Sequence, residues 1–195
     1  MPEYRRLIHP GGTFFFTLTA FRRAPWLCEP GALALMRKAI QKVRRERPFR
    51  IDAWVTLPEH IHCIWTLPEG EEDYSERWRL LKRAVSAELT PDVVEGFQGG
   101  ARRYRHLISP PQGSRKKRGE RLIWQRRFWE HMIRDDRDYA YHCDYIHYNP
   151  VKHGHVTAPV EWPWSSFHRF VREGAYPVDW AADEPPDLPD DVGHE

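Results

Sequence analysis

The sequence predicts a mixed α+β domain in which one antiparallel sheet carries helices on one of its faces. Three observations support this fold class. Short runs rich in aromatic and β-branched residues alternate with segments whose apolar residues recur at helical spacing. Two of the short runs meet at Pro58, as expected for an antiparallel pair joined by a tight turn. The resulting order is strand, helix, strand, strand, helix, strand, helix, which is that of a ferredoxin-like split-βαβ sheet.

Three strands are expected in the first half of the chain. Residues 11–23, with the sequence GGTFFFTLTAFRR, predict the first strand because aromatic and β-branched residues follow a glycine turn. Residues 49–58 (FRIDAWVTLP) and 59–68 (EHIHCIWTLP) predict the second and third strands. The two abut, so we expect them to pair with each other.

Two helices are expected around these strands. Residues 29–48 predict the first, because four apolar residues fall on one face and Pro48 closes the segment; they are Leu33, Met36, Ile40 and Val43. Residues 73–89 predict the second, from Trp78, Leu81 and Val85 at helical spacing.

Residues 90–121 interrupt the pattern. They are rich in Gly, Pro, Arg and Lys, and we expect a long, mobile, basic loop. Residues 122–134 (LIWQRRFWEHMIR) predict the fourth strand. Residues 135–149 predict a helix that opens with aspartates near the positive end of its dipole and stops at Pro150. A Trp-rich C-terminal extension follows at residues 161–180.

The charge of the chain is unevenly distributed. Residues 179–195 contain seven acidic residues and no Lys or Arg, so the net charge of +2 divides into −7 there and +9 over residues 1–178. A basic body favours a polyanionic partner. We therefore predict one domain over residues 1–181 and an acidic, Pro-containing, disordered tail over residues 182–195.

Cysteine usage and hydropathy indicate a cytoplasmic protein. The three cysteines are widely spaced and give neither a disulfide framework nor a zinc pattern, which suits a reducing compartment. The first residues lack the apolar core of a signal peptide, and no apolar run approaches the ~18 residues of a membrane span.

The third predicted strand carries two histidines two residues apart, His60 and His62. Residues at that spacing point to the same face of a strand, with Ile61 and Cys63 on the other. Two imidazoles converging in this way can chelate a metal. The alternative interpretation, favoured for such a pair alone, is two half-buried histidines that hydrogen-bond to the backbone.

The predicted helix over residues 135–149 carries several tyrosines. Tyr141, Tyr145, Tyr148 and Asn149 recur at helical spacing and share a face. A second, more apolar face carries Tyr139, His142, Cys143 and Ile146. Simple packing with the hydroxyl groups at the rim explains Tyr139 and Tyr141. It explains less well why Asn149 follows Tyr145 by one turn.

These motifs carry a resemblance to a known family. EHIHCIW resembles the His-hydrophobic-His motif of the HUH single-strand endonucleases. DYIHYNPVKHG and IWQRRFWEHMIR together resemble the REP-associated tyrosine transposases, a branch of the single-tyrosine transposases, as do GGTFFFTLT and EWPWSSFHRF. The resemblance covers roughly residues 3–89 and 122–181. The histidine motif and the tyrosine motif together, in this order and spacing, are much more specific than either motif alone.

The resemblance implies a ferredoxin-like fold with both histidines on a central strand and a nucleophilic tyrosine that maps onto Tyr145. It also implies a divalent metal, Mg²⁺ or Mn²⁺, held by His60, His62 and an amide one turn past the tyrosine. Related transposases commonly use Gln there, whereas this chain has Asn149. The implied reaction is strand transfer through a 5′-phosphotyrosine link, and the implied protein is a nucleoid-associated monomer.

The implied substrate is single-stranded DNA beside an imperfect palindromic hairpin. Candidate contacts to the DNA backbone are Arg5, Arg6, Arg126, Arg127, Lys152 and His153. The basic run at residues 115–119 is either a grip for a hairpin stem or an unstructured loop. Two other functions remain open: a non-catalytic nucleic-acid-binding regulator with the same fold, and a zinc hydrolase that uses the two histidines but lacks an evident third His or acidic ligand.

Overall fold

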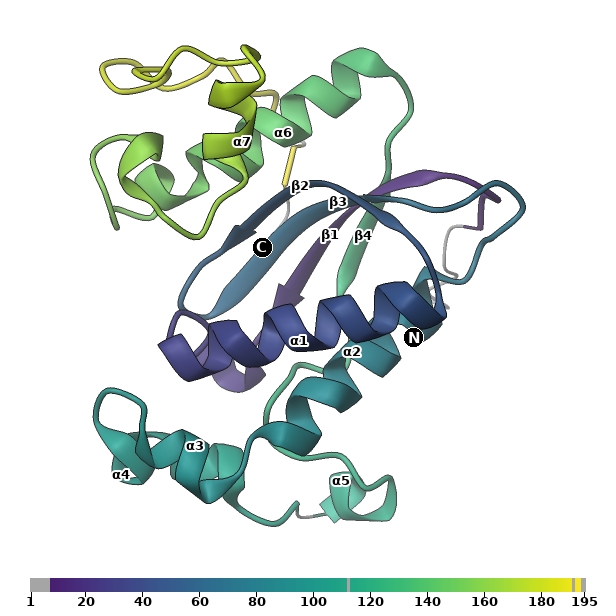
Figure 1. Ribbon diagram of the computed structural model, residues 1–195, viewed down its shortest axis with the longest axis vertical. Coiled ribbons are helices and arrows are strands. Elements are labelled where there is room, and N and C mark those ends of the chain that lie inside the picture. Colours follow the sequence, from purple (N-terminus) through teal and green to yellow (C-terminus); the bar gives the residue numbers. More distant parts are fainter. Residues whose placement is uncertain (1–7, 112, 191, 194–195) are drawn as a thin grey trace.

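A four-stranded antiparallel sheet forms the centre of the protein in the computed structural model, which describes residues 8–111, 113–190 and 192–193. Its strands are β1 (Thr13–Thr19), β2 (Arg50–Thr56), β3 (His60–Thr66) and β4 (Trp129–Met132), in the spatial order β2-β3-β1-β4 (Figure 1). The two central strands are therefore β3 and β1. The mixed α+β fold class predicted from the sequence is confirmed.

The register of β1 against β3 decides which side chains share a face. Thr17 lies opposite His62 and Thr19 lies opposite His60. Because side chains alternate along a strand, His60 and His62 point to one face and Ile61 to the other. Ile61, Cys63 and Trp65 belong to one buried cluster, whereas Ile64 belongs to a second cluster on the histidine face.

Two helices cover the first face and build the larger core. They are α1 (Pro30–Glu46) and α2 (Tyr74–Glu88), which lie side by side beneath the sheet in Figure 1. Asp73 caps α2 by accepting a hydrogen bond from the Glu76 amide. The Trp65 and Trp78 rings stack with centroids 4.0 Å apart and join the sheet to α2.

The opposite face of the sheet is also covered, so the prediction of helices on one face only is wrong. Helix α6 (Asp136–Lys152) packs against β2 and β3 on the histidine face (Figure 1). Phe15 lies in this second core while Phe14 and Phe16 lie in the first, which explains the run of three phenylalanines in β1. Helix α6 does not stop at Pro150 as predicted but continues to Lys152, because proline removes only one amide donor there.

Residues 90–121 form short helices, so the prediction of one long irregular loop is wrong. The helices are α3 (Pro91–Glu95), α4 (Gly100–Ile108) and α5 (Gly113–Lys117). Val94, Tyr104 and Leu107 from this segment are buried in the first core.

The fourth strand is shorter than predicted. In the residues just before β4, the only pairing is an isolated bridge between Trp124 and Ala20. The three-residue 3₁₀ helix η1 (Phe21–Arg23) follows β1.

The Trp-rich extension packs along β2 and α6. It contains η2 (Pro159–Glu161) and α7 (Phe167–Arg172). Ser165 bridges to Val55 and thereby extends the sheet beyond the β2 edge. The buried His147 ring of α6 lies 2.8 Å from the Ser166 hydroxyl oxygen. Within the described residues, no helix combines the length and the apolar character needed to cross a membrane.

Candidate active site

His60 and His62 meet on the α6 face of β3. Both side chains are buried, and their ring centroids lie 4.6 Å apart in an edge-on arrangement. The alternation of side chains along β3 produces this pairing, as the sequence predicts. Two buried imidazoles in contact cost free energy unless their nitrogens have partners.

Each imidazole is oriented by a hydrogen bond at Nδ1. The Thr17 Oγ1 atom lies 2.9 Å from His62 Nδ1, and the Glu59 Oε1 atom lies 3.0 Å from His60 Nδ1. Burial raises the pKa of Glu59, but its hydrogen bond and charge interaction with His60 dominate and lower that pKa overall. An ionised Glu59 only accepts, so His60 Nδ1 carries a hydrogen, and Nε2 is the ring nitrogen left to face other partners.

The fit of a metal can be tested on this donor set. The Asn149 Oδ1 atom lies 3.3 Å from His60 Nε2. A neutral His60 with its hydrogen on Nδ1 would offer an Nε2 lone pair beside this carbonyl oxygen, and a cation held between the two atoms would satisfy both. Two imidazole nitrogens and one amide oxygen suit Mn²⁺ or Mg²⁺. The residues therefore fit the divalent metal that the resemblance implies, and the shorter Asn149 reaches His60.

Tyr145 is the tyrosine of α6 that lies next to the histidines. Its ring centroid is 5.1 Å from that of His62, and the side chain is 3% exposed. Burial raises the pKa of Tyr139 well above its usual range. The Tyr141 hydroxyl accepts a hydrogen bond from Arg137, at 2.9 Å. Tyr145 is therefore the tyrosine of this helix for which a ring contact with the histidine pair is observed.

Lys152 and His153 also lie at this site, although we predicted both as contacts to the DNA backbone. The Lys152 Nζ donates to the Tyr145 hydroxyl oxygen at 3.3 Å and lies 4.7 Å from the ring centroid. The His153 ring centroid is 5.2 Å from that of His60. Lys152 ends α6 in the same turn as Asn149, and His153 is the C-cap, so the end of the helix brings both residues to the site.

The other predicted DNA contacts lie apart from the histidines or outside the described residues. Arg126 is paired with Glu120 at 2.6 Å and Arg127 is exposed next to it. Arg5 and Arg6 lie outside the described residues. Their roles stay predictions.

The C-terminal segment reaches the candidate nucleophile. Leu188 and Val192 pack against the second core cluster, which contains Tyr145. Gly193 lies against the Tyr145 ring so closely that a Cβ built on it would overlap the ring. Sequence reasoning missed this contact, as it missed the orienting roles of Thr17 and Glu59. Only Glu59, next to His60 in the sequence, gave a signal that could have been used.

A second group of possible ligands lies at the start of α6. His131, Asp138 and His142 offer ligand atoms within 4.8 Å of one another. The Arg134 guanidinium, however, already donates to both Asp138 oxygens, at 3.0 and 3.3 Å. Burial raises the pKa of Asp138, but its hydrogen bonds to Arg134 and His131 outweigh this effect and lower the pKa strongly. We therefore assign this cluster to joining β4 to α6.

The fold and the site define a class of protein. A ferredoxin-like antiparallel sheet with a His-x-His pair on a central strand and a tyrosine on the following helix is the arrangement implied by the resemblance to HUH transposases. No family model matches the chain. Individual proteins do match it. The REP-associated tyrosine transposase of Escherichia coli (strain K12) is 46% identical over 183 residues, which cover 94% of this chain and 93% of that protein.

Two further matches agree. A protein of Haemophilus influenzae described as a putative REP-associated tyrosine transposase is 40% identical over 96% of this chain and 97% of its own length. A solved structure described as the REP-associated tyrosine transposase bound to a REP hairpin is 44% identical, covers 100% of this chain and 98% of its own, and superposes with a TM-score of 0.75. The chain belongs to the family of REP-associated tyrosine transposases, and it is an enzyme of the DNA transposase class.

Proposed function

We propose that this protein cuts one strand of DNA beside a hairpin and transfers it, using Tyr145 as the nucleophile. The observation that carries the proposal is the convergence of Tyr145, His60, His62 and Asn149 in one buried site. The solved relative bound to a REP hairpin supports DNA hairpins as the substrate class. The basic charge of residues 1–178 supports it independently.

The proposed reaction exchanges one phosphate ester for another. The Tyr145 hydroxyl oxygen attacks the phosphorus atom, a new O–P bond forms, and the bond between phosphorus and the 3′ oxygen breaks. The proton lost by Tyr145 is balanced by the proton that the 3′ oxygen gains as it leaves. The products are a 5′-phosphotyrosine link and a free 3′-OH. Because the link keeps the ester bond, a second 3′-OH can reverse the step and rejoin a strand.

The ligands for the metal are His60, His62 and Asn149, with Thr17 and Glu59 as the outer partners that orient the rings. When bound, Mn²⁺ or Mg²⁺ supplies positive charge to a non-bridging phosphate oxygen.

Other residues of the chain prepare the nucleophile. Phe15 and His62, which stack on each other, both meet the Tyr145 ring edge-on and so restrict the direction of its hydroxyl group. Lys152, 3.3 Å from the hydroxyl oxygen, is placed to stabilise negative charge on that oxygen as its proton leaves. This is a more specific role than the backbone contact expected for Lys152 from the sequence.

One chain supplies every proposed ligand and the nucleophile. His60 and Tyr145 come from β3 and α6 of the same molecule, and Asn149 lies one turn beyond Tyr145. A second copy is therefore not needed to complete the site, which supports a monomer as the active form.

The experiment that tests the proposal uses the full-length protein and labelled DNA hairpins with a single-stranded flank, in Mn²⁺ or Mg²⁺. We expect a protein–DNA band that survives denaturation, together with a released fragment whose 3′-OH a polymerase can extend. Cleavage that leaves a free 5′-phosphate with no DNA on the protein would indicate hydrolysis. Binding without any cleavage would instead support the non-catalytic regulator.

A further inference from the structure

Residues 162–166 (WPWSS) belong to a motif that the proposed reaction does not use. This segment runs along the free edge of β2 and bonds to it through the backbone. The Ser166 amide donates to the Trp54 carbonyl oxygen at 2.8 Å, and the Thr56 amide donates to the Trp164 carbonyl oxygen at 2.9 Å. The segment therefore has a fixed register on β2.

Thr56 connects this segment to the histidine pair. Its carbonyl oxygen accepts a buried hydrogen bond from the Trp162 ring nitrogen at 2.9 Å. In the pairing of β2 with β3, Thr56 lies opposite Ile61, which is the residue between His60 and His62. The WPWSS segment is thus held in a defined position relative to the histidines.

Ser166 also joins this edge of the sheet to α6. Its hydroxyl oxygen accepts from the Trp54 amide at 2.8 Å and lies 2.8 Å from His147 Nε2. At the other side of the imidazole, His147 Nδ1 lies 3.4 Å from the Tyr176 hydroxyl oxygen, and that hydroxyl donates to Asp144 Oδ1 at 2.6 Å. We call these four side chains, Ser166, His147, Tyr176 and Asp144, the Ser166 network.

One protonation state satisfies every member of the Ser166 network. Tyr176 donates its one hydrogen to Asp144, so its oxygen is left to accept from His147 Nδ1. A neutral ring with its hydrogen on Nδ1 then accepts the Ser166 hydroxyl hydrogen at Nε2. Burial, aided by the charge of Arg169, lowers the pKa of His147 to about 3 and so keeps the ring neutral. Such a network tolerates less displacement than apolar contacts do, because each shift leaves a buried polar group unpaired.

Two members of the network flank the candidate nucleophile in α6. Asp144 precedes Tyr145, and His147 follows it by two residues. Asp144 and His147 are three residues apart and share a face of the helix, whereas the Tyr145 side chain leaves the axis about 100° round from Asp144. A rotation or slide of α6 that broke the network would therefore also move Tyr145 and Asn149 relative to the histidines.

We infer that Ser166, His147 and Tyr176 are positioning residues that set the rotation and the axial position of α6, and so hold Tyr145 and Asn149 against the histidine pair. This inference rests on the proposed function, and it adds to it the device that aligns the two halves of the site. It also gives a role to the WPWSS segment, which the sequence analysis singled out by resemblance alone.

The test compares Ser166→Ala and Tyr176→Phe in the full-length protein. Tyr176→Phe removes the hydroxyl and keeps the ring, which packs against Phe170 and Trp180. Both variants should lower the rate of covalent adduct formation at saturating DNA and Mn²⁺ by about ten-fold or more, because small misplacements of a reacting group are costly. Their affinity for a flanked hairpin should stay constant. Ser166→Thr restores the hydroxyl and should recover part of the rate.

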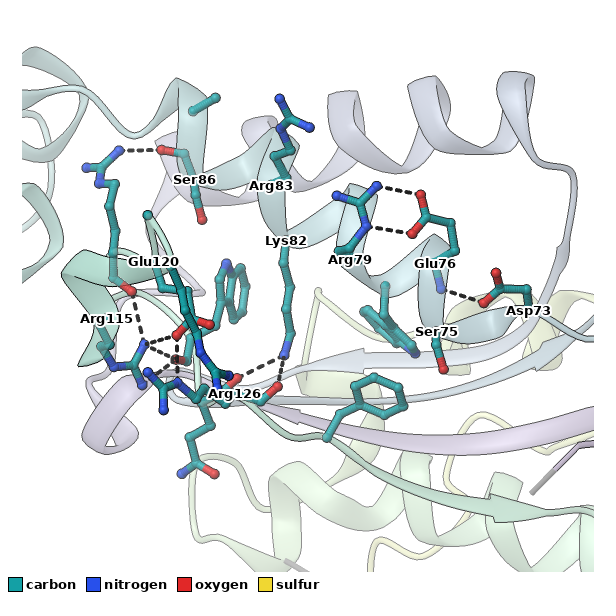
Figure 2. A pocket seen from close by; sticks show the side chains of 18 residues that line it. Asp73, Ser75, Glu76, Arg79, Lys82, Arg83, Ser86, Arg115, Glu120 and Arg126 are labelled. Atoms are coloured by element: carbon teal, nitrogen blue, oxygen red, sulfur yellow. Dashed lines mark hydrogen bonds and ion pairs between the residues drawn. The ribbon is translucent and has the colours of Figure 1, made fainter. Parts of the chain in front are cut away.

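Two controls match these variants. Ser86→Ala makes the same chemical change on the α2 face of the sheet, where Ser86 lines a cavity (Figure 2). Thr66→Val removes a hydrogen bond to Asp52, at 2.7 Å, at the end of β3 far from His60, and so matches the loss of stability. Both controls should keep the saturated rate, since neither residue belongs to the Ser166 network.

A spectroscopic measurement separates positioning from general destabilisation. Protein labelled with 3-fluorotyrosine gives a fluorine NMR resonance for Tyr145, which is assigned by its loss in Tyr145→Phe. We expect this resonance to shift or broaden in Ser166→Ala and to stay unchanged in Ser86→Ala and Thr66→Val.

Two results would overturn the inference. One is an unchanged Tyr145 resonance in Ser166→Ala. The other is a saturated rate equal to that of the wild type in a variant whose resonance has moved. Failure of the proposed function is distinguishable, since wild-type protein would then form no covalent adduct, whereas the fluorine resonance would still report the position of α6.

Discussion

Gly193 lies against the face of the Tyr145 ring with no room for a side chain between them. The contact joins the acidic C-terminal segment to the candidate nucleophile, and Leu188 and Val192 pack beside it. Under the proposed reaction, this contact beside the Tyr145 ring would restrict the approach of a scissile phosphate. We therefore expect DNA to displace the segment before strand cleavage.

Gly193→Ala should accelerate formation of the covalent adduct. The new Cβ would overlap Tyr145, and Gly193 has a φ of +73°, a conformation that costs other residues about 1–2 kcal/mol. Such a cost shifts release of the segment by roughly five-fold or more. Gly174→Ala is the matched control, because Gly174 has a φ of +77° and nothing within 4 Å of the added atom. Equal adduct rates for Gly193→Ala and Gly174→Ala would show that the segment does not limit access.

Deletion of residues 183–195 should act in the same direction and also tighten DNA binding. The deleted segment carries most of the negative charge of the C-terminus, and the basic surface attracts DNA more strongly without it. The effect should be largest at low salt, where charges are least screened. Unchanged affinity at low salt would mean that the segment acts on Tyr145 alone.

Lys152→Met should lower the cleavage rate at saturating DNA by about ten-fold or more. The ammonium group donates to the Tyr145 hydroxyl oxygen, and one donor to developing charge is typically worth a factor of about 10²–10³ when fully buried. Lys152 is exposed, and screening by solvent reduces that figure. Lys152→Arg should restore part of the rate. If Lys152 only contacted the DNA backbone, affinity and its salt dependence would fall while the saturated rate stayed constant.

His60→Ala or His62→Ala should abolish cleavage and leave binding of a flanked hairpin largely intact, because binding relies on basic residues elsewhere. Thr17→Val keeps the shape of the side chain and removes its hydrogen bond to His62. We expect it to raise the Mn²⁺ concentration needed for half-maximal cleavage about ten-fold to a hundred-fold. Undiminished cleavage by both alanine variants would eliminate the metal site.

His147 should make the fold sensitive to acid. Burial, aided by the charge of Arg169, lowers its pKa from 6.5 to about 3. Between these values the unfolded chain binds a proton that the folded chain excludes, so stability falls as pH falls from about 6.5 towards 3, by up to about 1.4 kcal/mol per unit. NMR should show no titration of the His147 ring above about pH 4 in the folded protein, but titration near 6.5 in urea. Titration near 6.5 in the folded state would contradict the burial assigned to this ring.

The parts of the fold that follow from local periodicity could be predicted from the sequence. His60 and His62 share a face because of strand alternation, and Tyr145 precedes Asn149 by one helical turn. The second helical layer was missed, although Phe14, Phe15 and Phe16 in succession already indicate a strand that is buried on both faces. The helices within residues 90–121 are short, and their ends are set by tertiary contacts such as those of Arg121.

The outer parts of the candidate site depend on contacts between distant residues. Thr17 meets His62 only because β1 and β3 pair in one register, which no local pattern specifies. The positive charge of Lys152 led us to predict a contact with the DNA backbone. Its position beside Tyr145 could not be predicted, because it depends on α6 continuing past Pro150. Gly193 and Tyr145 lie far apart in the sequence, and no local pattern predicts their contact, which exists only in the packed structure.

The central claim is that Tyr145 is the nucleophile. The most direct test is mass spectrometry of the covalent adduct formed by full-length protein on a flanked hairpin in Mn²⁺, after nuclease and protease digestion. We predict the residual nucleotide on the peptide that contains Tyr145, no adduct from Tyr145→Phe, and retained adduct from Tyr141→Phe and Tyr148→Phe. A nucleotide on Tyr148, or an adduct formed by Tyr145→Phe, would contradict the account.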